Sequence, residues 1–197
     1  MLTGFSEDDL RIVAIDPGIN TCGFAVLSIS METFEISILD AYTVKSNSFV
    51  TQNKMFAMIH GDKAAKLHGL EEHIHTLCER CEPYMVTSEA PFMGRFAAAF
   101  GALKEVTMVL RKGSYRYDFM MPFMFIEPTP VKKHMKVKGT SSDKNLMTVA
   151  LSKRTDLVWA DTIVFDNLDE HSVDAVSVGL YHVDRIREQL IKENKKH

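Results

Sequence analysis

The sequence predicts an α/β domain in which helices flank a mixed five-stranded β-sheet. Five runs rich in branched and aromatic residues have the length of strands and are bounded by polar breaks. Longer segments carry apolar residues at steps of three and four, which is the period of a helix with one buried face. The order is three strands, a helix, a strand, a helix, a strand and further helices. This order favours a sheet with both antiparallel and parallel neighbours.

The first three expected strands lie close together in the chain. Arg11–Ile15 has the composition of a buried strand and ends at an Asp-Pro-Gly turn that begins with Asp16. The glycine of that turn permits a sharp change of direction. Gly23–Ser30 and Thr33–Val44 follow after short polar breaks. Because so little chain separates the three strands, we expect an antiparallel meander.

The segment after the meander is expected to be mainly helical. A polar loop near Ser46–Asn53 precedes a long helix that runs to about Cys81, with kinks at Gly61 and Gly69. Later expected elements are a strand at Tyr84–Ser88, a helix at Arg95–Arg111, a strand at Phe123–Ile126, a helix that starts at Thr129, and helices at Asp143–Lys153 and about Glu170–Ile191.

Composition indicates one globular domain over residues 1–197. Hydrophobic residues make up 46% and charged residues 25% of the chain, an ordinary balance for a packed protein. No stretch approaches the roughly 20 apolar residues that span a bilayer. The N-terminus lacks the layout of a secretory signal, and three cysteines cannot form a disulfide framework. We therefore expect a protein of the reducing cytoplasm that is not secreted.

The distribution of charge is more informative than its sum. The formal net charge is −3, which does not itself indicate a nucleic-acid-binding protein. The net charge is a poor guide to nucleic-acid binding when one face of a protein is basic and another face is acidic. Five lysines fall within Val131–Lys144, at Lys132, Lys133, Lys136, Lys138 and Lys144. Such a run is commonly a solvated face.

Acidic residues stand where a sheet-based site would collect them. Asp16 and Glu89 each follow an expected strand, and His171 and Asp174 open the last helix. Residues three apart on a helix share a face, so His171 and Asp174 are expected to point at one spot. Asp169 is a further acid nearby. Taken singly, each position has an ordinary explanation as a turn residue, a solvated charge or a partner of the helix dipole.

Together these four side chains suit the hydrolysis of a phosphodiester by two metal ions. Such reactions use cations about 3.5–4 Å apart, one of which activates water while the other stabilises the leaving oxygen. Hard divalent cations bind several carboxylate oxygens. The combination therefore predicts that the four side chains converge on one metal centre, which suits this chemistry.

Four segments resemble conserved blocks of the RuvC-family Holliday junction resolvases. The blocks occur in the family's order and extend from residue 11 to about residue 183. They are IVAIDPGINTCGFAVL, SEAPFMGR, VKKHMKVKGTSSDKNLM and HSVDAVSVGLYHV. The segments 46–61 and 113–122 differ from the bacterial pattern. The resemblance is therefore to a divergent member of the family, such as a viral or bacteriophage protein.

The resemblance implies an RNase H-like fold and an endonuclease that resolves four-way DNA junctions in recombination and repair. Asp16, Glu89 and Asp174 match acidic metal ligands of the family, and His171 takes a ligand's position, as a ligand or as a base. Two Mg²⁺ ions per active site are expected, and Mn²⁺ is also expected to support activity because imidazole suits it.

The resemblance also implies contacts with DNA and a second copy of the chain. Phe92 matches an aromatic residue near the branch point, although without the resemblance a core position would be expected for it. Lys132 and Lys144 match DNA-contacting lysines, which makes phosphate contact the expected role of the whole lysine run. A homodimer in the cytoplasm of a bacterial or phage-infected cell is expected, with helix Arg95–Arg111 in the interface.

Other functions remain open at this stage. The protein could cut forks and flaps as well as junctions, or it could be a catalytically inactive relative that only binds DNA. An Asp-x-Gly turn followed by a further glycine also opens actin-like ATPases, where the loop holds phosphate, but those need a second, related domain. Cys78 and Cys81 have the spacing of half a zinc site, and no second cysteine pair accompanies them.

Overall fold

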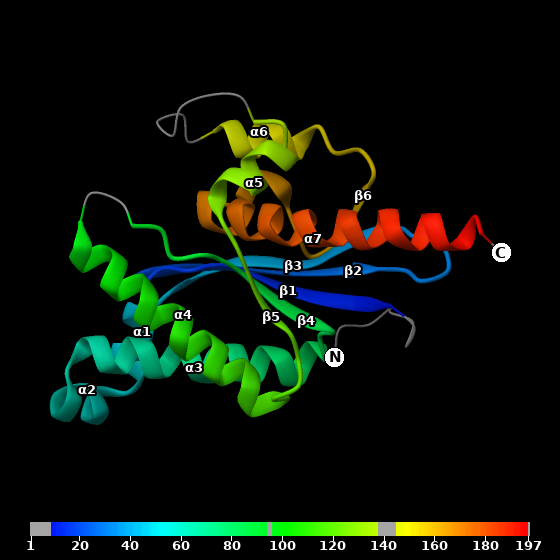
Figure 1. The fold of residues 1–197 in the computed structure, drawn as a ribbon. Coiled ribbons are helices and arrows are strands. Elements are labelled where there is room, and N and C mark those ends of the chain that lie inside the picture. Colours follow the sequence, from blue (N-terminus) through cyan, green and yellow to red (C-terminus); the bar gives the residue numbers. More distant parts are fainter. Residues whose placement is uncertain (1–8, 94–95, 138–144, 197) are drawn as a thin grey trace.

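The computed structural model describes residues 9–93, 96–137 and 145–196, and it shows a central sheet between two helical layers (Figure 1). The predicted α/β class is confirmed. The sheet has six strands in the order β5-β4-β1-β2-β3-β6. Their bounds are Leu10–Asp16 (β1), Thr21–Ile29 (β2), Ile36–Lys45 (β3), Met85–Glu89 (β4), Phe123–Ile126 (β5) and Leu157–Trp159 (β6).

The predicted antiparallel meander forms the middle of this sheet. β1 pairs with β2 and β2 with β3 in antiparallel register, whereas β4, β5 and β6 join in parallel. The predicted number of five strands is wrong, because β6 adds a sixth at the edge beside β3. With only three residues, β6 is too short for its periodicity to be seen in the sequence.

Helices cover both faces of the sheet (Figure 1). One face carries α5 (Pro128–His134), α6 (Leu146–Ser152) and α7 (Glu170–Asn194), and a 3₁₀ turn at Phe165–Asn167 precedes α7. The other face carries α1 (Asn47–Gln52), α2 (Lys54–His60), α3 (Asp62–Cys81) and α4 (Ala97–Tyr117). No helix in the described ranges is long and apolar enough to cross a membrane.

The region of residues 46–81 differs from the prediction. The expected loop near Ser46–Asn53 contains α1. The expected kink at Gly61 is a complete break between α2 and α3, where the glycine has a φ of +87°. Gly69 does not kink α3. A Cβ atom there would lie 2.1 Å from the ring of Phe49 in α1, so this glycine makes room for the packing of α1.

The core has two parts, one on each face of the sheet. Ile12 and Ala14 of β1 face α7, whereas Val13 and Ile15 face α3 and α4. This alternation is the two-residue period of a strand that is buried on both faces. α7 therefore lies on the face to which the carboxylate of Asp16 also points.

Two glycines bring α7 close to the sheet. A Cβ atom on Gly23 of β2 would lie 2.1 Å from the carbonyl oxygen of His171, and one on Gly179 of α7 would lie 2.3 Å from Cδ1 of Leu27. Both contacts are closer than real Cβ atoms allow, so larger residues would push α7 away. The first turn of α7 is thereby held directly over the end of β1 and the start of β2.

Candidate active site

Two carboxylates meet at one edge of the sheet because β1 and β4 are parallel neighbours. Ile15 of β1 is in register with Ser88 of β4, so the next residues, Asp16 and Glu89, end the two strands side by side. Both side chains are half-buried. The structure thus brings together two acids that are separated by more than seventy residues in the sequence.

The N-terminus of α7 supplies the other two predicted residues. Asp169 caps the helix, since its Oδ1 accepts a hydrogen bond from the backbone N–H of Ser172 at 2.9 Å. The same oxygen accepts from the hydroxyl of Thr43 in β3 at 2.6 Å. The carboxylate of Asp169 therefore stabilises the start of α7. His171 and Asp174 follow in the first turns of α7, over the ends of β1 and β4.

His171 contacts Asp16 directly. Its Nδ1 lies 2.7 Å from Oδ2 of Asp16, and its Nε2 lies 2.9 Å from the hydroxyl of Thr21. The hydrogen bond with Asp16 raises the pKa of His171 above its ordinary value, against the opposing effect of burial.

The remaining two acids share an electrostatic environment with Asp16. Burial, together with the nearby charges of Asp16 and Asp174, raises the pKa of Glu89 to about 7. Burial and Asp16 raise the pKa of Asp174 to about 6. In both cases the positive charge of Lys132 acts in the opposite direction. Three carboxylates thus form one half-buried cluster in which the ionised forms repel one another.

The lysine run is placed only in part by the structure. Lys132 lies on α5, close enough to the cluster to act on both Glu89 and Asp174. Lys133 is exposed on the same helix, and Lys136 is exposed just after it. Lys138 and Lys144 lie outside the described residues.

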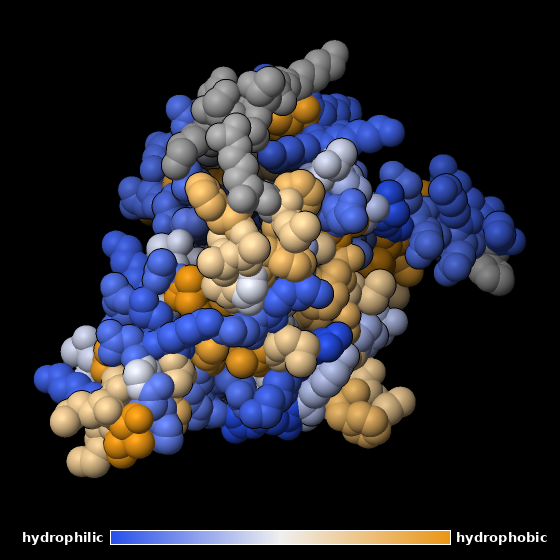
Figure 2. Space-filling view, turned by 60° about the vertical axis from the view of Figure 1, so that its left-hand side comes forward, coloured by the Kyte–Doolittle hydropathy of each residue, from blue (hydrophilic) through white to orange (hydrophobic). Residues whose placement is uncertain are grey.

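Phe92 is on the surface, three residues after Glu89. Its side chain is 67% exposed, and Met93 and Phe96 beside it are exposed too. The core position that the residues alone suggested for Phe92 is therefore wrong. On the face of the molecule that Figure 2 shows, apolar surface lies among hydrophilic residues. An exposed aromatic ring that follows Glu89 so closely in the chain is available to a ligand.

Known proteins resemble this chain in sequence and in fold. No protein-family model matches it. The crossover junction endodeoxyribonuclease RuvC of Synechocystis sp. is 24% identical to it over 185 residues, which are 94% of this chain and 98% of the relative. A structure of T. thermophilus RuvC in complex with a Holliday junction substrate superposes with a TM-score of 0.63 at 15% identity, covering 91% of this chain and 96% of that one.

The chain is similar to RuvC in sequence over nearly its whole length and in fold. The yeast mitochondrial Holliday junction resolvase Ydc2 has the same fold, with a TM-score of 0.63, 13% identity, and coverage of 96% of this chain and 83% of that one. The predicted RNase H-like fold is confirmed by these similarities.

Sequence reasoning missed two threonines that contact the first turn of α7. Thr21 holds the ring of His171, and Thr43 holds the cap residue Asp169. Each bond joins residues more than a hundred positions apart, so no local pattern in the sequence marks it.

The acids of this cluster lie near one another, but in the described part of the chain no three His, Cys, Asp or Glu side chains lie close enough together to hold one metal ion. Among the predicted ligands, Asp16 and His171 contact each other directly.

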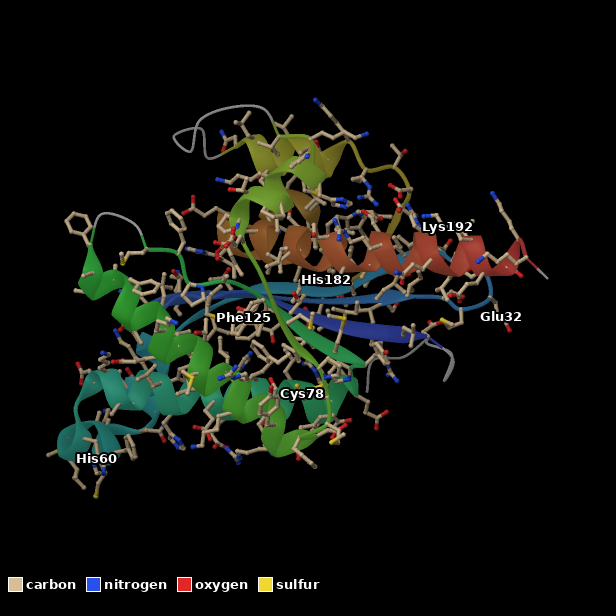
Figure 3. All side chains as sticks on the ribbon, in the orientation of Figure 1. Glu32, His60, Cys78, Phe125, His182 and Lys192 are labelled. Carbon is tan, nitrogen blue, oxygen red and sulfur yellow. The ribbon has the colours of Figure 1, made fainter. Side chains whose placement is uncertain are left out.

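The cysteine pair lies elsewhere. Cys78 and Cys81 are buried free thiols, and Cys78 lies on α3, on the face of the sheet away from α7 (Figure 3). Burial raises the pKa of Cys78 to about 12, so its thiol is protonated at neutral pH. In the described residues, no third His, Cys, Asp or Glu side chain is grouped with the two cysteines as a metal ligand.

Proposed function

We propose that this chain is a metal-dependent endonuclease that cuts four-way DNA junctions. The observation that carries the proposal is the convergence of Asp16, Glu89, Asp174 and His171 at one end of the sheet. The RuvC-like fold supports it, since relatives with this fold are named as crossover junction endonucleases and Holliday junction resolvases. We further propose that residues 1–197 act as one nuclease domain in the cytoplasm.

The residues present fit divalent cations. Asp16, Glu89 and Asp174 offer hard carboxylate oxygens, and the raised pKa values of Glu89 and Asp174 reflect burial together with nearby negative charges that a cation would neutralise. We propose two Mg²⁺ ions per site, with Mn²⁺ also effective because His171 offers an imidazole. Bound cations would supply an activated water and stabilise the departing oxygen.

Other side chains of the site would position the DNA. Lys132, next to the acids, would contact the phosphate beside the scissile bond, and Lys133 and Lys136 would contact neighbouring phosphates. We propose the same role for Lys138 and Lys144. The exposed ring of Phe92 would stack on a base opened at the branch point.

We propose that the active form is a homodimer. A four-way junction has approximate two-fold symmetry, so a symmetric dimer presents two sites to opposing strands. Helix α4, which contains most of the predicted interface Arg95–Arg111, exposes its first turns and the side chain of Met108. Exposed apolar surface of this kind supports an interface there. Sedimentation equilibrium would measure whether the mass of the protein in solution is that of a dimer.

The test is cleavage of a labelled synthetic four-way junction in Mg²⁺ or Mn²⁺, beside linear duplex, fork and flap substrates. We expect paired symmetric nicks in the junction. The Asp16→Asn protein should bind the junction without cutting it. This substitution keeps the shape of the side chain and removes a charge that binds metal. Equal cutting of forks and flaps would indicate a broader branched-DNA nuclease. Tight binding without cutting by the wild-type protein would indicate an inactive relative.

A further inference from the structure

Both ring nitrogens of His171 are engaged within the protein. Nδ1 faces Asp16 at the end of β1, and Nε2 faces the hydroxyl of Thr21, the first residue of β2. The imidazole therefore bridges two neighbouring strands. A ring held at both nitrogens has one orientation, whereas a ring held at one nitrogen can swing about that bond.

A bound metal ion would give the two ring nitrogens of His171 different roles. Asp16 and His171 are both proposed metal ligands, and Nδ1 is the nitrogen that faces Asp16. Only Nδ1 can therefore share a cation with Asp16 without rotation of the ring. Once Nδ1 is used as a ligand, the proton of the neutral imidazole must be carried by Nε2. That N–H then needs an acceptor, and the oxygen of Thr21 is the atom next to it.

We propose that Thr21 is a positioning residue that fixes the orientation and tautomer of His171, so that Nδ1 is presented to the metal ion. This inference rests on the proposed metal-dependent function. A hydroxyl suits the role in both states of the site. It donates to Nε2 while Nδ1–H is bonded to Asp16, and it accepts from Nε2–H when Nδ1 binds metal.

The surroundings of Thr21 keep its hydroxyl in place. Thr21 is half-buried and paired with Lys45 of β3. Its β-branched side chain has few allowed rotamers, so little freedom remains for the hydroxyl to move away. Replacement by valine keeps the shape and the preference for a strand and removes only the polar contact.

Thr43 provides a matched control. It is also a half-buried threonine on a neighbouring strand, and its hydroxyl also holds the first turn of α7. Its partner is the carboxylate of Asp169 and not the ring of His171. Loss of the Thr43 hydroxyl should weaken the helix cap without changing how His171 is presented.

The experiment measures Mn²⁺ affinity of the full chain by the electron paramagnetic resonance of free Mn²⁺. We expect Thr21→Val to weaken binding about 10-fold or more, as loss of a partner behind a histidine ligand typically does. Thr21→Ser should restore most of the affinity, and Thr43→Val should bind like the wild type. ¹⁵N NMR of the Mg²⁺-saturated protein should show the His171 proton on Nε2.

Two results would overturn this role of Thr21 while leaving the proposed function standing. One is a Thr21→Val protein with wild-type Mn²⁺ affinity, and the other is a His171 that keeps its proton on Nδ1 in saturating Mg²⁺. A wild-type protein that binds no Mn²⁺ and cuts no junction would overturn the proposed function and the role of Thr21 together. Urea unfolding of each variant confirms that all of them are folded.

Discussion

Gly23 is the residue on which the position of His171 depends most directly. It lies in β2 under the backbone of His171, and the carbonyl oxygen there leaves no space for a Cβ atom. Because the obstacle is backbone and not the end of a flexible side chain, any larger residue must displace the start of α7. The geometry of the site and the stability of the fold are therefore coupled at this glycine.

Gly23→Ala should damage both properties. We expect the free energy of unfolding to fall by about 1–3 kcal/mol, as overpacking of a core commonly does. Junction cleavage should fall by about 100-fold, because displacements near 1 Å cost that much in a positioned site. Urea unfolding and a cleavage assay measure the two effects.

Gly101→Ala is the control for stability. A Cβ atom at Gly101 in α4 meets nothing within 4 Å, so this change should leave stability unchanged or raise it by up to about 1 kcal/mol. Equal losses of stability in both variants would contradict the explanation by close packing.

Substitution of Phe92 can test junction binding without affecting the stability of the fold. Because its side chain is 67% exposed, Phe92→Ala should change the free energy of unfolding by less than about 0.5 kcal/mol. Affinity for a junction should nevertheless fall by about 1–3 kcal/mol, the usual contribution of a stacked aromatic ring. Gel-shift titration measures the affinity. Phe119→Ala, at a 76% exposed position beyond the other end of α4, should bind like the wild type.

At the scale of elements, a buried cluster of charged side chains connects α5 to α7. Asp184 of α7 accepts hydrogen bonds from Arg154 at 2.8 and 2.9 Å and from His134 of α5 at 2.7 Å. Arg154 also binds Asp156, just before β6. α5 carries Lys132, so this cluster holds the lysine next to the acidic site. Burial alone would raise the pKa of Asp184, but the bonds from His134 and Arg154 outweigh burial and lower it.

The stabilisation by Asp184 should therefore depend on pH. A carboxyl whose pKa is lower in the folded state stabilises fully above its unfolded pKa of about 3.9 and loses this effect as the pH falls through the folded value. Asp184→Asn should destabilise the protein by roughly 3 kcal/mol near neutral pH, because it breaks a buried pair. The difference from the wild type should shrink below about pH 4.

Urea unfolding between pH 3 and pH 7 measures this difference. Asp161→Asn, at an exposed position, serves as the control and should match the wild type throughout. A difference for Asp184→Asn that stays constant over the whole range would show that the ionised carboxylate is not what stabilises the cluster.

At the scale of the whole molecule, acids and lysines are kept on neighbouring elements at one end of the sheet. A net charge of −3 is therefore compatible with DNA binding, since the cations of α5 stand next to the acids that metal ions would neutralise. Lys192 lies near the other end of α7, away from this region (Figure 3).

Replacement of the exposed lysines should alter the salt dependence of junction binding. Each phosphate contact contributes about −0.9 to the slope of log affinity against log salt concentration. Lys133→Ala and Lys136→Ala together should therefore reduce the slope by about 2. Lys192→Ala should leave it unchanged. Fluorescence anisotropy at several salt concentrations measures the slope, and identical slopes for all variants would contradict phosphate contact by Lys133 and Lys136.

The sequence alone predicted most of the elements that carry the site. The buried strand before Asp16, the strand before Glu89 and the helix after Asp169 all form nearly as expected, because strand and helix periods are local properties of the chain. The candidate residues Asp16, Glu89, His171 and Asp174 could be named because each stands at the end of such an element.

What only the tertiary structure decided is how these elements meet. The sixth strand, the helix α1 in the expected loop and the exposure of Phe92 depend on contacts between distant segments. The hydrogen bonds of His171 with Asp16 and Thr21 span about 150 residues, and the fit of Gly23 under His171 is a contact between two backbones. A periodic pattern records which face of an element is buried, but not which residue of another element lies against it.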